Sequence, residues 1–373
     1  MKAALLTNFV PPYRKSLFKN LSARLDQLTI LVSVHMEGNR TWKPDYEGLN
    51  VVKQRTISYS KKWEHEAGFQ ETTEVHIPFD TIFKLAKAKP DVVVSGELGF
   101  RSLLASIYCM IYGKPLILWL TLSDHTEQNK AGIRLILRKF LLNRATVLLC
   151  NGAASERYLK QLGISKPKFF APYTSDFELQ KPKISFNARR KILFTGQLIA
   201  RKGVKQMTAA LKTWSEKNPD KELELIVAGN GPEILYFEML RNCANVELSL
   251  LGTVAYEDLA KLYNDADIYI FPTLADEWGV VVNEALSAGL PILGSLYSQA
   301  GEELVKNEVN GWLFKPDDEN EFAAAISKAL NADDNTLTHF SKNSTESIRA
   351  ITAETIADEM MTEIGRASCR ERV

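Results

Sequence analysis

Two successive series of alternating strands and helices predict an α/β protein, with two Rossmann-like domains facing each other across a cleft. In each half of the chain, short apolar runs alternate with longer stretches whose apolar residues recur at helical spacing. This alternation favours a parallel sheet covered by helices. A segment with few apolar residues separates the halves, and 373 residues suffice for two domains of about 100–200 residues each. We therefore expect ligands to bind at the carboxyl ends of the strands, between the halves.

The first half alternates five apolar runs with four amphipathic stretches. Each run is as short as a buried strand, and each stretch has one apolar face. Predicted strands cover residues 3–7, 27–33, 91–95, 115–120 and 146–150, and predicted helices cover residues 13–25, 100–112, 132–142 and 153–162. Residues 37–78 are polar, aromatic and irregular, and we interpret them as an insertion with a mobile loop around residues 58–68. We assign residues 1–172 to a first domain.

A linker at residues 173–190 precedes the second series. This segment has few apolar positions and lies next to Pro172, as interdomain linkers often do. Predicted strands then cover residues 191–195, 223–228, 246–250, 268–271 and 291–294, and predicted helices begin at Val204 and cover residues 256–264 and 280–288. We assign residues 191–352 to a second domain, followed by a helix at residues 353–363.

The last ten residues, 364–373, read IGRASCRERV. They match the in-frame translation of a common short-read sequencing adapter along their whole length, and they end the apolar period of the preceding helix. We interpret them as an artefact, with the true C-terminus missing, and exclude them from fold reasoning. On this interpretation the helix is truncated at residue 363, and deleting residues 364–373 costs little stability.

The composition is that of an ordinary soluble globular protein, with 45% hydrophobic and 24% charged residues. The formal net charge of +1 argues against a nucleic-acid partner, because such proteins usually carry a clear basic excess. Four scattered cysteines form no CxxC pair, which indicates reduced thiols and no metal site. The first apolar run is too short for a signal peptide. We expect a cytoplasmic protein, with peripheral contact at the inner membrane surface left open.

The most informative stretch, residues 276–291, reads DEWGVVVNEALSAGLP. It places Gly279 at the start of a predicted helix, and Glu284 lies eight positions after Asp276. A glycine lets the backbone approach a ligand closely, and the N–H groups at a helix start favour phosphate. A carboxylate with two acceptor oxygens suits neighbouring sugar hydroxyls. The segment therefore offers places for a diphosphate, a ribose and a second sugar, against the alternative of an ordinary strand–loop–helix unit.

Glycine turns follow three predicted strands of the second half, at residues 196–203, 229–232 and 251–253. The first turn also carries Arg201 and Lys202, which can neutralise phosphate. For the glycines of the second turn we favour tight-turn geometry over ligand contact. No GxGxxG motif opens a helix in the chain, which argues against a dinucleotide-dependent dehydrogenase.

Taken together, these blocks resemble the retaining GT-B glycosyltransferases of family 4, also described as glycosyl transferases group 1. The resemblance is strong over residues 191–330 and weaker over residues 1–173. The blocks that carry it are FTG at residues 194–196, RKG at 201–203, VAGNGP at 227–232, LG at 251–252, AD at 266–267, FPT at 271–273, Asp276 with EALSAGLP at 284–291, and GWLFKP at 311–316.

The resemblance implies a role for each acidic residue. Glu284 would hold the donor ribose, and Asp276 would meet the transferred sugar. The family usually has Glu at the first position, so Glu277 is the alternative to Asp276. Arg is common in the family where Gln197 stands, and Arg201 would then supply the charge. The remaining donor contacts that the resemblance implies involve Lys202, Gly196, Trp278, Gly279, Val280 and Thr253.

Two candidates lie in the first half, which the resemblance makes the acceptor domain. Arg14 follows the first strand and is the candidate contact for an acceptor or a phosphate, against a proline-stiffened helix start. His125 is the candidate near the donor sugar, and Asp124 and Thr121 are the alternatives in register. Residues 133–144 are basic and amphipathic, a pattern typical of helices at anionic membranes. We favour an ordinary helix there, packed on a sheet with a basic outer face.

We expect a retaining glycosyltransferase that uses a nucleotide-diphosphate sugar and needs no cofactor and no metal. The partners implied are a nucleotide sugar and a glycan or lipid-linked acceptor of cell-surface polysaccharide or glycolipid synthesis. A GT-B nucleotide-sugar 2-epimerase and a non-catalytic sugar-nucleotide binding protein remain as alternatives. The sequence does not name the base, the sugar, the acceptor, the linkage position or the oligomeric state.

Overall fold

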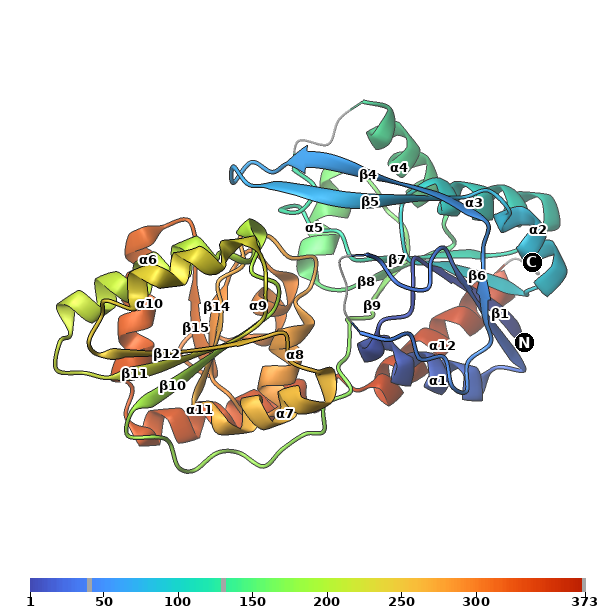
Figure 1. The fold of residues 1–373 in the computed structure, drawn as a ribbon. Coiled ribbons are helices and arrows are strands. Elements are labelled where there is room, and N and C mark those ends of the chain that lie inside the picture. The colour runs from blue at the N-terminus through green and yellow to red at the C-terminus, as the bar shows by residue number, and fades with distance from the viewer. Residues whose placement is uncertain (39–41, 129–131, 371–373) are drawn as a thin grey trace. The chain divides into compact units, whose positions relative to one another are not determined.

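The computed structural model describes residues 1–38, 42–128 and 132–370, and it divides into two compact units (Figure 1). The first unit comprises Met1–Glu66, Glu71–Asp176 and the C-terminal segment from Ile351 onwards. The second unit comprises Ala67–Gln70 and Phe177–Ala350. Each unit contains its own parallel sheet, so the predicted two-domain α/β fold is confirmed.

A seven-stranded parallel sheet forms the centre of the first unit, in the order β3-β2-β1-β6-β7-β8-β9. Its strands are β1 (Lys2–Thr7), β2 (Gln27–Val32), β3 (Val51–Lys53), β6 (Val92–Ser95), β7 (Leu116–Leu120), β8 (Val147–Cys150) and β9 (Lys168–Phe170). The inner strands are continuous apolar runs because helices cover both faces of the sheet. The strand order reverses between β1 and β6, so the loops after these strands flank a switch point.

Helices cover the two faces of this sheet in separate groups (Figure 1). Helices α1 and α12 contribute Phe18 and Met360 to one core, and α2 to α5 contribute Leu85 and Leu141 to the other. The helical elements of the unit are η1 (Pro12–Arg14), α1 (Lys15–Arg24), α2 (Thr81–Ala88), α3 (Phe100–Tyr112), α4 (Ile133–Arg144), α5 (Ala153–Gln161) and α12 (Ala353–Arg370).

The expectation of a mobile loop around residues 58–68 is wrong. Strands β4 (Thr56–Glu64) and β5 (Gln70–Pro78) form a two-stranded sheet there, with Gly68 at a positive φ of 76° in the connecting turn. Most side chains of β4 are exposed, so the segment lacks the alternation of a half-buried strand. Its β-branched and aromatic residues were the remaining signal for a strand.

The expected end of the last helix at residue 363 is also wrong, because α12 continues to Arg370. Ile364 and Ala367 are buried in the core that α12 shares with α1. The sequence origin that we infer for residues 364–373 is a separate matter and stays a prediction. The expectation that deleting them costs little stability does not fit this burial.

The second unit contains a six-stranded parallel sheet in the order β12-β11-β10-β13-β14-β15. Its strands are β10 (Arg190–Thr195), β11 (Leu223–Ala228), β12 (Val246–Gly252), β13 (Ile268–Phe271), β14 (Ile292–Ser295) and β15 (Gly311–Phe314). Its helical elements are η2 (Ala200–Lys202), α6 (Val204–Lys217), η3 (Pro232–Leu240), α7 (Tyr256–Asp265), α8 (Val280–Ser287), α9 (Gln299–Leu304), α10 (Glu319–Asn331) and α11 (Asp334–Ile348). The order reverses between β10 and β13, where a ligand site is expected.

Candidate active site

The loops after β10 and β13 are joined at the switch point of the second unit. The carbonyl oxygen of Arg201 accepts hydrogen bonds from the Leu274 amide at 2.8 Å and from the Thr273 hydroxyl at 3.0 Å. Gly203 makes this approach possible, since its φ is 68° and a Cβ atom there would lie 2.0 Å from the Pro272 carbonyl oxygen. The end of the first glycine turn and the start of the acidic loop therefore form one rigid edge.

The second glycine turn lies directly against the first. A Cβ atom on Gly229 would lie 1.8 Å from the carbonyl oxygen of Gly196, and one on Gly231 would lie 2.4 Å from that of Leu198. Both positions therefore require glycine for the approach of two backbones. This geometry agrees with the interpretation of Gly229 and Gly231 as tight-turn residues.

Asp276 and two cations of the first glycine turn form a cluster at this edge. The carboxylate of Asp276 makes an ion pair with Lys202, and Nη1 of Arg201 lies 3.4 Å from its Oδ2. Arg201 also donates to the Ala275 carbonyl oxygen at 3.0 Å. Burial alone would raise the pKa of Asp276, but the charges of Lys202 and Arg201 lower it from 3.8 to about 2. Asp276 is therefore ionised throughout the physiological range.

The loop after Asp276 leads directly into α8. The backbone N–H of Trp278 bonds to the Asp276 carboxylate, while the Trp278 side chain is buried and donates to Asn283 Oδ1 at 2.8 Å. Gly279 has a φ of 100°, and a Cβ atom there would lie 2.7 Å from the Phe271 ring. No side chain caps the start of α8 at Val280. The indole therefore holds the loop in place. At the start of α8 the backbone amides are the groups that face outward along the helix axis, without a side-chain cap.

Glu284 is buried on α8, with 4% of its surface exposed, and belongs to a network of hydroxyl groups. The Tyr263 hydroxyl donates to Glu284 Oε2 at 2.8 Å. Thr195 Oγ1 lies 2.8 Å from the Tyr263 hydroxyl and 2.9 Å from that of Tyr269. Burial raises the pKa of Glu284 from 4.5 to about 7, although the bond from Tyr263 acts in the opposite direction. Burial also raises the pKa of Tyr263 well above 10, so this hydroxyl keeps its proton.

The remaining predicted donor residues are more exposed. Glu277 is exposed, and its backbone carbonyl oxygen accepts from Gln299 at 2.6 Å. Gln197 is half-buried in the first glycine turn, and Thr253 is exposed after β12, two strands away from β10. The structure thus joins Asp276 to Lys202 and Arg201 at one edge of the second unit.

Arg14 is buried in the first unit, in η1 at the switch point between β1 and β6, with 8% of its surface exposed. Its guanidinium carbon lies 4.0 Å from the ring centre of Tyr173 and 4.7 Å from that of Trp119. Its Nη1 donates weakly to Thr7 Oγ1, at 3.5 Å. Within the described ranges no carboxylate forms an ion pair with Arg14. Two aromatic rings therefore hold this cation in place of a counter-ion.

His125 is half-buried and lies against a second histidine of the same unit. The ring centres of His125 and His65 are 5.1 Å apart, and Nε2 of His65 lies 3.2 Å from the His125 carbonyl oxygen. Of the two alternatives in register, Asp124 makes an ion pair with Arg157 at 2.8 Å, and Thr121 is buried. His65 lies in the hairpin that we interpreted as a loop, so no sequence pattern connected it with His125.

Arg101 is a buried residue that the sequence analysis also missed. Its guanidinium donates to the Asn8 side chain and, at 2.6 Å, to Ser33 Oγ, so it joins the loops after β1 and β2. Its Nη1 lies 3.8 Å from the Glu97 carboxylate, in the loop after β6. Burial lowers the pKa of Arg101. On the sequence, Arg101 is an unremarkable second residue of a helix, so no local pattern could have identified it.

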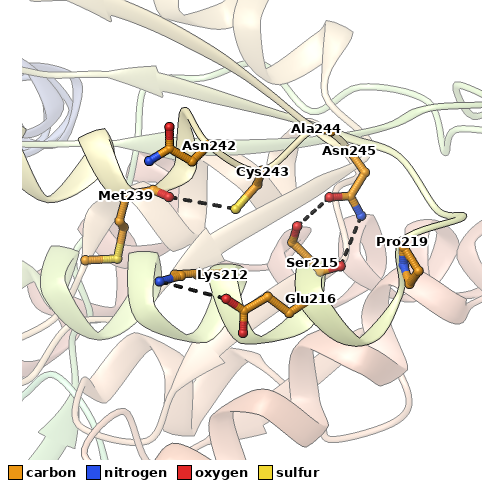
Figure 2. A pocket seen from close by; sticks show the side chains of 9 residues that line it. All are labelled: Lys212, Ser215, Glu216, Pro219, Met239, Asn242, Cys243, Ala244 and Asn245. Atoms are coloured by element: carbon orange, nitrogen blue, oxygen red, sulfur yellow. Dashed lines mark hydrogen bonds and ion pairs between the residues drawn. The ribbon is translucent and has the colours of Figure 1, made fainter.

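A pocket of the second unit lies away from these residues (Figure 2). It is lined by the end of α6 and the segment after η3, including Ser215, Cys243 and Asn245. These residues precede β11 and β12, so the pocket belongs to the amino-terminal edge of the sheet and not to the candidate site. In the part of the chain that the structure describes, we find no cluster of three metal-ligating side chains. None of the described helices is long and apolar enough to span a bilayer.

Comparisons with known proteins agree with this architecture. Residues 176–347 match the family model described as Glycosyl transferases group 1. An uncharacterized glycosyltransferase of Haemophilus influenzae is 24% identical over 302 residues, which cover 80% of each chain. The UDP-Gal:alpha-D-GlcNAc-diphosphoundecaprenol alpha-1,3-galactosyltransferase of Escherichia coli is 25% identical over 284 residues, covering 70% of this chain and 72% of that one.

Solved structures support the fold. The crystal structure of Anabaena Alr3699/HepE in complex with UDP has a TM-score of 0.75 at 17% identity, and the match covers 98% of this chain and 100% of that one. The match to the family model thus falls almost entirely in the second unit, and the chain as a whole has the two-domain fold of GT-B enzymes. We conclude that the protein is a glycosyltransferase, in which residues 176–347 match the group 1 family model.

Proposed function

We propose that this enzyme is a retaining family 4 transferase that moves a sugar from a nucleotide-diphosphate donor to a glycan or lipid-linked acceptor. The observation that carries the proposal is the cluster of Asp276, Lys202 and Arg201 beside the uncapped start of α8. A carboxylate, two cations and helix N–H groups meet there at one edge, and these are the groups that a sugar and a diphosphate require.

Each group of the cluster has a distinct task in this proposal. Lys202 and Arg201 neutralise the diphosphate, with Arg201 replacing the charge that Gln197 lacks. Asp276 accepts hydrogen bonds from hydroxyls of the transferred sugar, and its low pKa keeps it an acceptor. The amides from Trp278 to Val280 bind the diphosphate and the sugar, together with Gly196. No metal is needed if these groups neutralise the leaving group.

Glu284 is the proposed ribose ligand, and Thr253 completes the donor site near the base. Ionised Glu284 has two acceptor oxygens for the two ribose hydroxyls. The bond from Tyr263 fixes its orientation. Since the pKa of Glu284 is about 7 before nucleotide binds, ribose binding is expected to favour loss of its proton.

Retention follows in this proposal from a front-face displacement. The bond between the anomeric carbon and the diphosphate oxygen breaks on the face where the acceptor oxygen forms its new bond. A diphosphate oxygen takes the proton of the acceptor hydroxyl. Lys202, Arg201 and the start of α8 stabilise the charge on the leaving group. In the first unit, His125 would contact the donor sugar, and Arg14 would contact the acceptor or a phosphate.

The relatives support a more specific donor and acceptor. The E. coli relative is named for UDP-galactose and a diphosphoundecaprenol-linked sugar, and HepE was crystallised with UDP. We therefore place UDP-sugars first among the donors and a lipid-linked glycan of cell-surface polysaccharide or glycolipid synthesis first among the acceptors. A cytoplasmic location at the inner face of the membrane would suit both substrates.

Incubation with a panel of UDP-, GDP-, ADP- and TDP-sugars tests the proposal. We expect one donor to be consumed, by transfer or by slow hydrolysis, with its anomeric configuration retained in the NMR spectrum of the first-formed product. Inversion would contradict the retaining mechanism. Epimerised donor or a glycal formed without acceptor would favour the epimerase, and binding without turnover of any donor would favour a non-catalytic protein.

A further inference from the structure

Large apolar side chains gather on the outer sides of three neighbouring helices of the first unit. Ile133 and Ile136 of α4 are 86% and 69% exposed, and Phe140 follows them one turn later. Phe83 of α2 and Ile111 of α3 are exposed as well. The inner sides of α2, α3 and α4 share one core, which places the helices together on one face of the sheet (Figure 1). We call the outer side of these helices the α2–α4 face.

The helices that form the α2–α4 face contain no acidic residues. Helices α2, α3 and α4 contain seven Lys and Arg residues and no Asp or Glu. The chain as a whole is nearly balanced, with 46 basic and 45 acidic residues. Arg101 and Arg138 are buried, so the basic side chains with access to solvent are Lys84, Lys87, Arg134, Lys139 and Arg144. The three helices therefore combine exposed apolar side chains with a net positive charge.

Buried polar contacts fix the orientation of α4. Arg138 makes a buried ion pair with Glu127 and donates to the Tyr158 hydroxyl at 3.1 Å. Leu141 and Leu142 are buried in the shared core. The opposite side of the helix consequently carries the exposed isoleucines. The outer side of α4 therefore carries exposed apolar side chains in addition to the basic residues that the sequence analysis expected there.

We propose that the α2–α4 face binds the surface of an anionic lipid bilayer. The apolar side chains would enter the boundary between headgroups and acyl chains, and the flanking cations would lie at the lipid phosphates. A second copy of the chain fits this face less well, because it would bring positive charges against positive charges. The proposal adds a docking surface to the proposed function, since it would bring the first unit to a lipid-linked acceptor. It requires no donor and no turnover.

Co-sedimentation of the full chain with lipid vesicles, without nucleotide, tests the proposal. We expect at least tenfold stronger partition onto phosphatidylcholine vesicles containing about 30% phosphatidylglycerol than onto pure phosphatidylcholine. Partition should fall as salt is raised, because the lipid charges are screened. Arg134→Gln and Lys139→Gln should each weaken partition about fivefold, the effect of one cation near the surface. Lys261→Gln, an exposed lysine of the second unit, serves as control and should leave partition unchanged.

A second pair of variants tests the apolar contribution. Ile133→Asp combined with Ile136→Asp should abolish partition while leaving the melting temperature unchanged, because both side chains are already in water. Ile184→Asp in the second unit, where Ile184 is 81% exposed, is the matched control and should still partition. Equal partition onto neutral and anionic vesicles would overturn the proposal. So would loss of partition in Ile184→Asp, or a dimer in light scattering that the α4 variant dissociates while vesicles do not bind.

Loss of docking and loss of the proposed transfer can be told apart. Vesicle partition is measured without donor, and donor hydrolysis is measured without vesicles. The double α4 variant should hydrolyse the donor at the wild-type rate, because neither isoleucine belongs to the donor site in the second unit.

Discussion

The buried carboxyl group of Glu284 should make the stability of the second unit depend on pH. Burial raises the pKa of Glu284 from 4.5 to about 7 in the folded protein, and the unfolded chain keeps the ordinary value. The folded state therefore binds the proton more tightly. The resulting stabilisation is fully present below about pH 4.5 and is lost as the pH rises through about 7. The difference between the two pKa values corresponds to about 3 kcal/mol of unfolding free energy.

Glu284→Gln removes this titration but keeps the size of the side chain and an oxygen acceptor for Tyr263. We expect the variant to be more stable than the wild type by less than about 1 kcal/mol at pH 5 and by about 3 kcal/mol at pH 8. The difference at pH 8 corresponds to about 6–12 °C in melting temperature for a unit of this size. Scanning calorimetry without nucleotide measures the difference, and Glu216→Gln on the exposed side of α6 is the control. A difference between wild type and Glu284→Gln that stays constant from pH 5 to pH 8 would refute the reasoning.

Three further predictions concern Asp276, Gly229 and the end of α12. Asp276→Asn should lower the rate of transfer at least about tenfold with little change in nucleotide affinity, whereas Glu277→Gln should leave both the rate and the affinity unchanged. If steady-state kinetics instead show the loss of rate in Glu277→Gln and not in Asp276→Asn, the exposed Glu277 is the sugar ligand. Gly229→Ala should destabilise the second unit by about 1–3 kcal/mol, because the new methyl group meets a backbone oxygen, while Gly38→Ala, in open space, should be neutral in the same melting experiment. Deleting residues 364–373 should destabilise the first unit by about 2–4 kcal/mol, the loss expected for two buried side chains, and an unchanged denaturation midpoint would show that the burial in α12 contributes nothing.

The parallel sheets were predictable because their strands are buried on both faces. Such strands are continuous apolar runs, so residues 223–228 and 268–271 were identified with the bounds that the structure has. The same reasoning failed for β4, whose side chains are mostly in water and show no apolar period. It also failed for the end of α12, because the sequence match suggested an origin for residues 364–373 but could not show where their side chains would lie.

The site was predictable only as far as its motifs reach. Spacing along the chain brought Asp276 and Glu284 to one loop and helix, and the glycine turn brought Lys202 to the neighbouring strand end. The contact of Glu284 with Tyr263 depends on how α7 packs against α8, which no local pattern encodes. Tyr263 could equally be a core residue when it is seen in the sequence alone. The contacts of Arg101 could not be predicted from a local pattern either, because its partners come from three different loops.

The most direct test of the donor site is a calorimetric titration of UDP into the wild type and Glu284→Gln at pH 8. At this pH the wild-type carboxyl group is mostly ionised and able to accept both ribose hydroxyls. We predict that the variant binds UDP more weakly by about 1–3 kcal/mol, the contribution of a hydrogen bond to a charged group. Equal affinities in the two proteins would place the ribose elsewhere and would contradict the assignment of the donor site to this edge of the second unit.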